Sequence, residues 1–296
     1  MTVIVRGFAA EDIARVLGLL NEKRHGSHEF VPLTEEKLLS WMQEGRLSIF
    51  VAEEDTEIVG TSAYHDGHWG EEVEWVAVSN IRNGKAVENA LLAEVEKHVK
   101  KGQVFAVVDE GSPVINDWTL RGYRPEGGLY QLVADLGGVK PLPKLGNNVT
   151  VRSLKSGEET EFVCAVNAGF GWERLKPGEV QKWKAETPYF SEEWIHVAEC
   201  DGKIVSVVVA KQDMEYNRSF KGKRGYLGPA ATLPEYRGRN LASAVTCRAM
   251  NFLCEEGMDS VALYTQEQNV ASVALLRKLG FRVSHHWKFM RKSLKA

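Results

Sequence analysis

Cysteine is scarce in this sequence, and the few copies exclude the usual metal and disulfide frameworks. Four cysteines occur among 296 residues, and none forms a Cys-x-x-Cys pair, so we expect no zinc or iron–sulfur site and no other bound metal. Cys247 and Cys254 are seven positions apart on an expected helix, where they fit as small buried apolar groups. We therefore assume a reducing, cytoplasmic environment.

Long apolar runs and an excess of charge of one sign are also missing. No stretch of 18 apolar residues occurs, and residues 1–8 lack a cationic segment followed by an apolar one, so we expect neither a membrane span nor a signal peptide. A formal net charge of −3 gives no strong field for nucleic acid or an anionic membrane. The length suits two globular domains of about 150 residues each.

Glycine, proline and asparagine crowd into one segment, GGVKPLPKLGNN, which begins at Gly137 and ends at Asn148. No apolar period crosses it, so we expect a linker over 138–148 between a first domain, 1–137, and a second, 149–296. The same order of expected elements, β-α-α-β-β-β-α-β-α-β, occurs on both sides. We infer an internal duplication of a mixed α/β fold; the alternative is that two unrelated α/β halves look alike at this level.

Two pairs of residues set the expected register of the duplication. Arg82 and Arg237 are 155 positions apart (237 − 82). The Gly-aromatic pairs that begin at Gly122 and Gly280 are 158 positions apart (280 − 122), and each follows an expected helix. Glycine suits the left-handed backbone conformation just beyond a helix end.

The most informative motif is the run Thr232-Leu-Pro-Glu-Tyr-Arg-Gly-Arg-Asn-Leu-Ala242, which follows an expected strand and opens an expected helix. A helix N-terminus leaves main-chain N–H groups without partners, and together with the helix dipole these bind a diphosphate. Gly238 and Ala242 are small enough for the main chain to touch such a ligand, and Arg237 and Arg239 add positive charge. The alternative for an isolated Arg-Gly-Arg is a solvated turn or a nucleic-acid patch.

This run resembles the pyrophosphate-binding motif of the GNAT (Gcn5-related N-acetyltransferase) family, Q/R-x-x-G-x-G/A, with Arg237, Asn240 and Ala242 at the three named positions. Asn240 replaces the family's glycine; asparagine is the best substitute where φ is positive, and it could also cap the helix. The resemblance continues through Asn269 to the Leu-Gly-Phe ending at Phe281 and covers most of 149–296. It implies two tandem GNAT-like domains, the second binding acetyl-CoA through Thr232, Leu233, Arg237, Gly238, Arg239, Asn240, Leu241, Ala242 and Asn269.

The resemblance also implies an N-acetyltransferase that moves an acetyl group from acetyl-CoA to an amine by direct attack. Main-chain N–H groups at Thr232 and Leu233 would then stabilise the oxyanion. The family's usual acid, a tyrosine, is Leu276 here, so Tyr226, Tyr264 and water are the catalytic candidates; the alternative for both tyrosines is packing. In one branch a glutamate base lies six residues before the position of Thr232, which is Tyr226 in this chain.

Other bases and the acceptor stay open. Asp213, Glu215 or a water chain could act as the base. The acceptor, a small-molecule or peptide amine, would enter beside residues 167–174, Trp183, Tyr189 and Phe190. The two glycines of that stretch suggest a mobile lid and its aromatics an apolar or ring-bearing amine; the alternative is a plain helix connection.

Two other functions remain possible for the second half. A non-catalytic CoA-binding sensor is favoured by Leu276. A nucleic-acid module would use the basic residues of this region, and the negative net charge argues against it. We expect no nucleic-acid or membrane partner and a monomer or homodimer. The basic residues in question are Arg237, Arg239, Lys221, Lys223 and Arg224.

The first half is expected to keep the fold without the cofactor. With the offset of 155, Lys85 falls opposite Asn240 and Val87 opposite Ala242. A β-branched valine would fill the space that the diphosphate needs. A structural role, packing beside the second half or lining its cleft, would remain.

Overall fold

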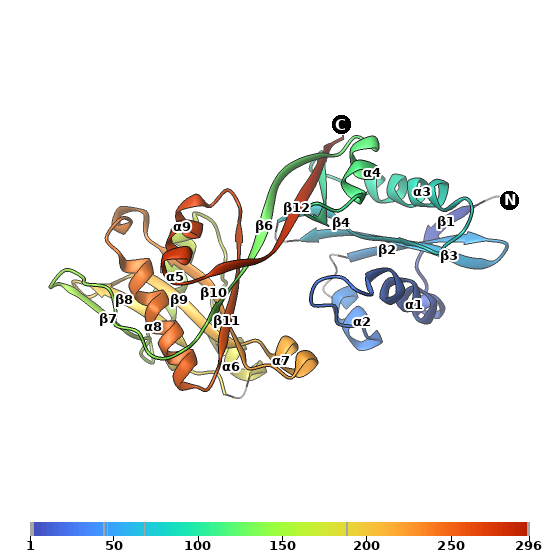
Figure 1. The fold of residues 1–296 in the computed structure, drawn as a ribbon. Helices are drawn as coiled ribbons and strands as arrows, with labels where there is room; N and C mark the ends of the chain where they lie inside the picture. Colours follow the sequence, from blue (N-terminus) through green and yellow to red (C-terminus); the bar gives the residue numbers. More distant parts are fainter. Residues whose placement is uncertain (1–2, 44, 46, 68, 188, 295–296) are drawn as a thin grey trace. The chain divides into compact units, whose positions relative to one another are not determined.

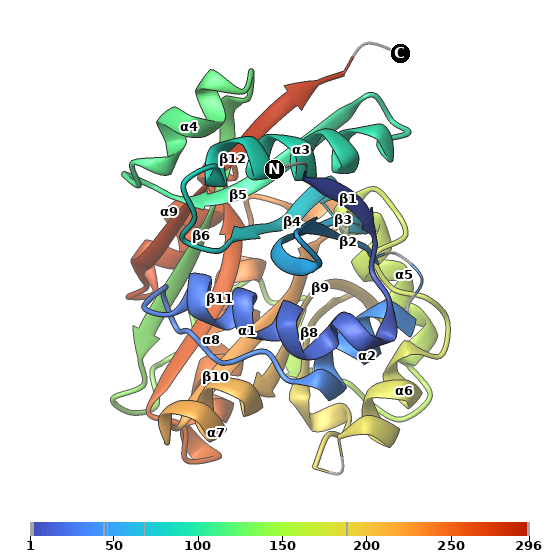
Figure 2. The same ribbon diagram turned by 90° about the vertical axis from the view of Figure 1, so that its right-hand side faces the viewer.

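The computed structural model describes residues 3–43, 45, 47–67, 69–187 and 189–294 (Figures 1 and 2). It is a mixed α/β fold that divides into two compact units. The first unit comprises Met1–Leu129 with His286–Ala296, and the second comprises Tyr130–His285. The predicted linker, 138–148, lies inside the second unit, between its strand residues 130–135 and 149–153.

The first unit follows the predicted order of elements without exception. Its sheet lies between the helices α1 and α2 on one side and α3 and α4 on the other (Figure 1). The elements are β1 (Ile4–Gly7), α1 (Ile13–Arg24), α2 (Glu35–Gln43), β2 (Leu47–Glu54), β3 (Glu57–Gly67), β4 (Gly70–Val78), α3 (Gly84–Lys97), β5 (Gln103–Asp109), α4 (Val114–Leu120) and β6 (Arg124–Asp135).

The second unit repeats this order with one extra helix, α7, which the expected order of elements does not include. Both α5 and α8 contact β9, whose residues 204–210 are all buried, so helices cover both faces of the sheet. The elements are β7 (Val149–Ser153), α5 (Glu159–Phe170), α6 (Glu179–Glu186), β8 (Ile195–Cys200), β9 (Lys203–Gln212), α7 (Met214–Phe220), β10 (Arg224–Thr232), α8 (Leu241–Glu255), β11 (Ser260–Gln266), α9 (Val270–Lys278) and β12 (Arg282–Ser293).

The last strand of the chain completes the sheet of the first unit. There the strand order is β1-β2-β3-β4-β5-β12, and in the second unit it is β6-β11-β10-β9-β8-β7. β12 pairs antiparallel with β5, with Trp287 opposite Asp109 and Ser293 opposite Gln103. A simple division of the chain at 138–148 therefore differs from the compact units in two ways: residues 286–296 belong to the first unit, and residues 130–137, with the end of β6, belong to the second.

Both units contain the same three-residue ion-pair network, which identifies them as repeats. In each, an arginine of the first strand donates hydrogen bonds to a carboxylate just before the first helix and to another on the second strand. Each member of the second network stands 146 positions after its counterpart (152 − 6, 158 − 12 and 199 − 53). The networks are Arg6–Asp12–Glu53 and Arg152–Glu158–Glu199. Their sequence signal is the pattern Val-x-Val-Arg at 3–6 and 149–152.

The strand registers repeat as well. Phe50 lies opposite Ser62 in the first unit, and His196 lies opposite Val208 in the second, again 146 positions on. Strands β4 and β10 each have a β-bulge at the same place, the first at Glu74 and the second at 228–229. A bulge bends a strand and redirects its side chains, so both units deform the sheet at the same point.

The connection between β4 and α3 differs from its counterpart in length. Five residues, 79–83, join β4 to α3, whereas eight, 233–240, join β10 to α8. Val87 is the fourth residue of α3 and is wholly buried on the sheet. The expected equivalences of Val87 with Ala242 and of Arg82 with Arg237 are therefore wrong, because the first unit lacks three residues of the loop.

The other predicted pair of equivalent residues is confirmed. Gly122 follows α4 with φ of 87°, and Gly280 follows α9 with φ of 98°. The next residue in each case, Tyr123 or Phe281, is buried and donates its N–H back to the last turn of the helix. This is the left-handed helix ending that the Gly-aromatic pairs predict.

His196 is a polar side chain in the core of the second unit, at the position that Phe50 occupies in the first. Its exposure is 0%, its ring packs against Phe252 at 5.1 Å, and within the described residues neither ring nitrogen has a hydrogen-bond partner. Burial, with the charge of Arg248, lowers the pKa of His196 to about 3. The ring is therefore neutral in the folded protein at all but strongly acidic pH.

We predict that His196→Phe stabilises the protein by about 1 kcal/mol at pH 7, because it removes an unsatisfied buried polar group. His196 binds a proton below pH 6.5 in the unfolded chain, but only below about pH 3 in the folded protein. The free energy of unfolding of the wild type therefore falls by up to about 1.4 kcal/mol for each unit of pH lowered across that window. Urea unfolding at pH 7 and pH 5 measures both effects. The reciprocal variant, Phe50→His, should gain acid sensitivity; equal acid sensitivity of His196→Phe and wild type would contradict the assignment.

Candidate functional site

The candidate site is the loop from the end of β10 to the start of α8. Within the described residues, the main-chain N–H groups of 238–243 donate to no main-chain or side-chain acceptor. The first main-chain bond of the helix is from Ala244 N to Asn240 O, at 3.0 Å. Six consecutive donors are thus available at the positive end of a 15-residue helix.

Two residues with left-handed backbone conformations direct the chain from the loop into the start of α8. Gly238 has φ of 77° and Asn240 has φ of 62°. Asparagine tolerates this region better than other residues with a Cβ, so its replacement of the family's glycine leaves the turn intact. Asn240 stands at the N-cap position, but its side chain accepts no capping hydrogen bond, contrary to the expectation that it caps the helix.

The two arginines of the motif are bonded to the surrounding main chain. Arg237 Nη2 donates to Gly169 O of α5 at 2.8 Å, and its Nε donates to Thr232 O at 3.3 Å. Arg239 Nη2 donates to Glu235 O at 3.3 Å. Arg237 therefore joins α5 to the end of β10, in addition to bringing positive charge to the loop.

The end of β10 is bonded on one side only. Parallel pairing with β11 extends over 224–226, whereas pairing with β9 continues from there to Thr232. The Thr232 hydroxyl is 2.8 Å from Ser206 Oγ on β9. Leu233 is buried and donates its N–H to Val205 O at 2.9 Å, so this N–H is not available to an oxyanion.

The two candidate tyrosines lie on neighbouring strands where β10 and β11 part. The rings of Tyr226 and Tyr264 have their centres 6.0 Å apart. Burial, and then the neighbouring Tyr264, raise the pKa of Tyr226 to about 12. Tyr264 is 41% exposed, and its hydroxyl accepts a hydrogen bond from Gln131 at 3.2 Å. Tyr226 is therefore a neutral, partly buried phenol at ordinary pH.

Several other predicted residues have structural partners. Asn269 caps α9, since its Oδ1 accepts the N–H of Ser272 at 3.3 Å. Leu276 is part of the core. Asp213 caps α7 and forms an ion pair with Arg224 at 2.8 Å, so it is not an uncommitted base. Arg224 is buried in this pair, which removes it from any nucleic-acid surface.

The segment after α5 is held in place by Asn167. Its Oδ1 accepts the N–H groups of Arg174 and Leu175 at 2.8 Å, and its Nδ2 donates to Leu175 O at 2.8 Å. Asn21 makes the same two-way bonds to Leu33 in the first unit, 146 positions earlier. Three hydrogen bonds favour a fixed connection over the mobile lid that the glycines suggested.

The predicted acceptor-side aromatics do come together, around a lysine that the sequence analysis missed. Trp183 and Phe190 have their ring centres 5.7 Å apart. Lys211 of β9 places its ammonium 4.1 Å from the centre of the Trp183 ring and 5.8 Å from that of Phe190. Lys211 is also the direct cross-strand partner of Tyr226. Tyr189 packs nearby against Trp194.

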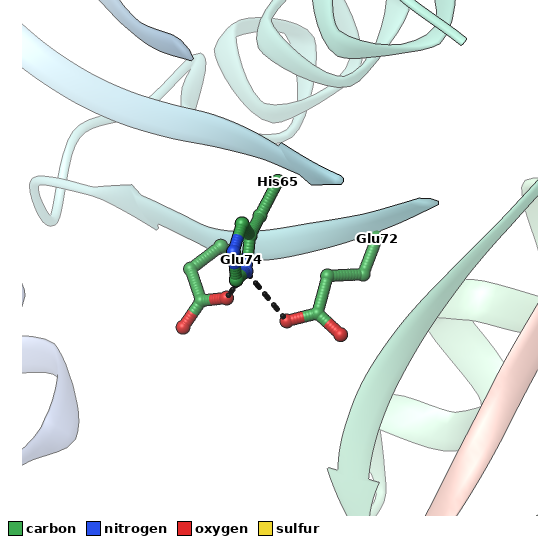
Figure 3. Close-up of side chains that lie close together, drawn as sticks. All are labelled: His65, Glu72 and Glu74. Atoms are coloured by element: carbon green, nitrogen blue, oxygen red, sulfur yellow. Dashed lines mark hydrogen bonds and ion pairs between the residues drawn. The ribbon is translucent and has the colours of Figure 1, made fainter. Parts of the chain in front are cut away.

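The first unit has an acidic group of side chains at the same strand positions (Figure 3). His65 is the cross-strand partner of Glu72, as Lys211 is of Tyr226, and its Nδ1 is 3.6 Å from Glu72 and 3.0 Å from Glu74. The bonds to Glu72 and Glu74 raise the pKa of His65 to about 10. One nitrogen and two oxygens within 4.8 Å of one another form a donor set that could hold a divalent ion; here the charged imidazole lies against both side chains, and burial raises the pKa of Glu72 to about 8.

Comparison with known proteins agrees with this geometry. Residues 158–281, from the start of α5 to the end of α9, match the model of the acetyltransferase (GNAT) family. Mycothiol acetyltransferase from Frankia alni is 32% identical over 178 residues, which cover 54% of this chain and 53% of that protein. The matches span about half the length of such curated relatives.

Solved structures share the fold over the whole chain. A GCN5-related N-acetyltransferase from Sphaerobacter thermophilus has a TM-score of 0.69 and 20% identity, covering 99% of this chain and 96% of its own. A tandem GNAT protein from the clavulanic acid biosynthesis pathway has a TM-score of 0.64 and 16% identity, and the match covers 100% of this chain and 99% of that protein.

The fold thus defines a GNAT-like scaffold that is present twice, with the eight-residue loop in the second unit alone. Residues 158–281 match the acetyltransferase (GNAT) family, and the chain as a whole has the fold of two GNAT-like domains. Among the described residues, no helix combines the length and apolar character needed to cross a membrane.

We predict that Gly169→Ala destabilises the protein by about 1–3 kcal/mol through overpacking. A Cβ at Gly169 would lie 2.8 Å from Ala231 Cβ and 3.2 Å from Thr232 N, so α5 could not approach the end of β10. Gly18→Ala is the matched control, because Gly18 is also helical and nothing lies within 4 Å of its added Cβ. Thermal unfolding that ranked the two variants equally would contradict close packing at this point.

Proposed function

We propose that the second unit is an N-acetyltransferase that moves the acetyl group of acetyl-CoA to the amine of a small molecule or peptide. The observation that carries the proposal is the run of unpartnered N–H groups from 238 to 243, beside a strand that has parted from its neighbour. The similarity to mycothiol acetyltransferases makes acetyl transfer the first reaction to assay.

The loop would bind the diphosphate of the carrier. Each N–H bonded to a charged oxygen contributes about 1.5–3 kcal/mol, so a few of the six donors are enough for useful affinity. Gly238 brings no side chain to the turn, and Ala242 brings only a methyl group. Arg237 would hold the loop against α5 while its charge favours an anion.

The open edge of β10 would receive the thioester. Because β11 pairs with β10 only as far as Tyr226, the main chain beyond it is unpaired on that side. N–H groups there, before Leu233, are the candidates for stabilising the oxyanion that forms on the thioester carbonyl. This moves the role away from Leu233, whose N–H is bonded to Val205.

Transfer itself needs a neutral amine and a proton for the departing thiolate. The amine nitrogen attacks the carbonyl carbon, the carbon–sulfur bond breaks, and the nitrogen loses a proton while the sulfur gains one. Tyr226 is the stronger acid candidate, because burial keeps its phenol protonated and it lies where the pairing with β11 ends. Tyr264 is more exposed and already shares its hydroxyl with Gln131.

The first unit would not bind acetyl-CoA in the same way. Its loop from β4 to α3 is three residues shorter than the one from β10 to α8, so it cannot form the same run of donors before the helix. Glu72 occupies the position of Tyr226 there, with a charged histidine beside it. We propose a structural role for this unit.

We predict that calorimetry finds one acetyl-CoA site per chain and that Gly238→Val weakens binding at least tenfold, since φ of 77° is strained for a branched residue. Gly84→Ala, at the start of α3, is the control and should leave the affinity unchanged, because its added Cβ would make only ordinary contacts. Two equivalent sites per chain, or equal losses in the two variants, would refute the proposal.

A second prediction concerns the proton donor. Tyr226→Phe should lower kcat by about 10²–10⁴ and leave the Kd of acetyl-CoA unchanged, because the ring packing is preserved. Tyr264→Phe should lower kcat far less. Steady-state release of the CoA thiol with a panel of amines measures both kcat values. A larger loss of kcat in Tyr264→Phe than in Tyr226→Phe would assign the role to Tyr264. No turnover with any amine, despite acetyl-CoA binding, would favour a sensor.

A further inference from the structure

We propose that the acceptor of the second unit carries an anionic group, a carboxylate or a phosphate, which Lys211 and Arg174 recognise beside Tyr226. The inference rests on the proposed function, because it names the substrate class of that same site. It begins from the position of Lys211, the cross-strand partner of Tyr226, with its ammonium over the Trp183 ring.

Lys211 is a partly buried cation without a carboxylate partner. Among the described residues, no acidic oxygen lies within 4 Å of its ammonium, and its neighbours are the faces of Trp183 and Phe190. Burial lowers the pKa of Lys211, although Glu179 and Glu186 act in the opposite direction from α6. Partly buried charges are normally paired, so this one is suited to an incoming anion.

Arg174 is the second cation of this region. Its main-chain N–H is bonded to Asn167, and its guanidinium lies 6.0 Å from the Phe170 ring centre and 5.8 Å from that of Trp172. It too has no ion-pair partner among the described residues. Its charge adds to the lowering of the Lys211 pKa and partly opposes the rise of the Tyr226 pKa.

Other partly buried cations of the unit behave differently. Arg152 pairs with two glutamates, Arg224 pairs with Asp213, and Lys184 pairs with Glu192. Arg248 also lacks a carboxylate partner, but it donates to Ser153 Oγ; Lys211 and Arg174 are the two unpaired cations whose charges act near Tyr226. In the first unit the matching strand positions carry two glutamates around His65 instead.

Two uncompensated positive charges select the acceptor by electrostatics. They attract a carboxylate or phosphate on the substrate and repel a polyamine. They also disfavour the protonated form of an amine bound close by, which lowers its pKa and supplies the neutral nucleophile.

The test compares acceptors that differ only in the anion. Phenylalanine against phenylalaninamide tests a carboxylate, and glucosamine 6-phosphate against glucosamine tests a phosphate. We expect kcat/KM to favour the anionic member of at least one pair by about 10- to 100-fold, and the pair that responds identifies the source. Equal kcat/KM within both pairs would overturn the inference.

Variants connect the preference to the two residues. Lys211→Met and Arg174→Gln should each lose most of the preference and leave the Kd of acetyl-CoA unchanged, whereas Lys211→Arg should retain it. Lys182→Met is the matched control, because Lys182 is an exposed lysine of α6 whose nearest carboxylate, Glu186, is 3.9 Å away. A preference that survives in both Lys211→Met and Arg174→Gln would assign anion recognition elsewhere and overturn the inference.

A binding measurement separates this inference from the proposed function. Quenching of tryptophan fluorescence reports occupancy near Trp183 without any turnover. Binding of phenylalanine or glucosamine 6-phosphate to wild type, lost in Lys211→Met, would support anion recognition even if no amine were acetylated; in that case only the acetyl transfer fails. Absence of both binding and preference would refute the inference while leaving acetyl-CoA binding intact.

Discussion

The turn that joins β10 to α8 depends on left-handed backbone at Gly238 and Asn240. These conformations bring the chain into the helix so that six N–H groups, 238–243, are left without internal acceptors. A buried helix start could not leave them so, because unsatisfied donors away from water are costly. The open loop, the close approach of Gly169 and the bonds from Arg237 all serve to hold that turn beside the parted strands.

The two units use one scaffold with opposite chemistry at matching positions. The ion pairs of Arg6 and Arg152 and the bonds of Asn21 and Asn167 recur 146 positions apart, and the bulges of β4 and β10 recur at matching strand positions. Between them, one unit places a lysine and a tyrosine where the other places a histidine and two glutamates. The scaffold is maintained by buried contacts, whereas the cleft side chains are free to diverge.

Much of the fold could be predicted because its signals are local. The periodicity of the apolar residues and the positions of the turn residues predicted the order of the elements. The Gly-aromatic pairs predicted the helix endings at Gly122 and Gly280. The loop of the first unit could not be aligned in this way. A three-residue deletion shifts the register, and only the burial of Val87 on the sheet reveals that it belongs to the helix interior.

By itself, the sequence determined the loop motif, the glycine and asparagine that suit its turn, and the presence of two similar halves. Each of these depends on neighbours along the chain. Tertiary structure alone decided the partners: that Leu233 donates to Val205, that Asp213 is bound to Arg224, and that Lys211 stands unpaired beside Tyr226. Such facts depend on strands that are distant in sequence and adjacent in the sheet, and no local pattern encodes that register.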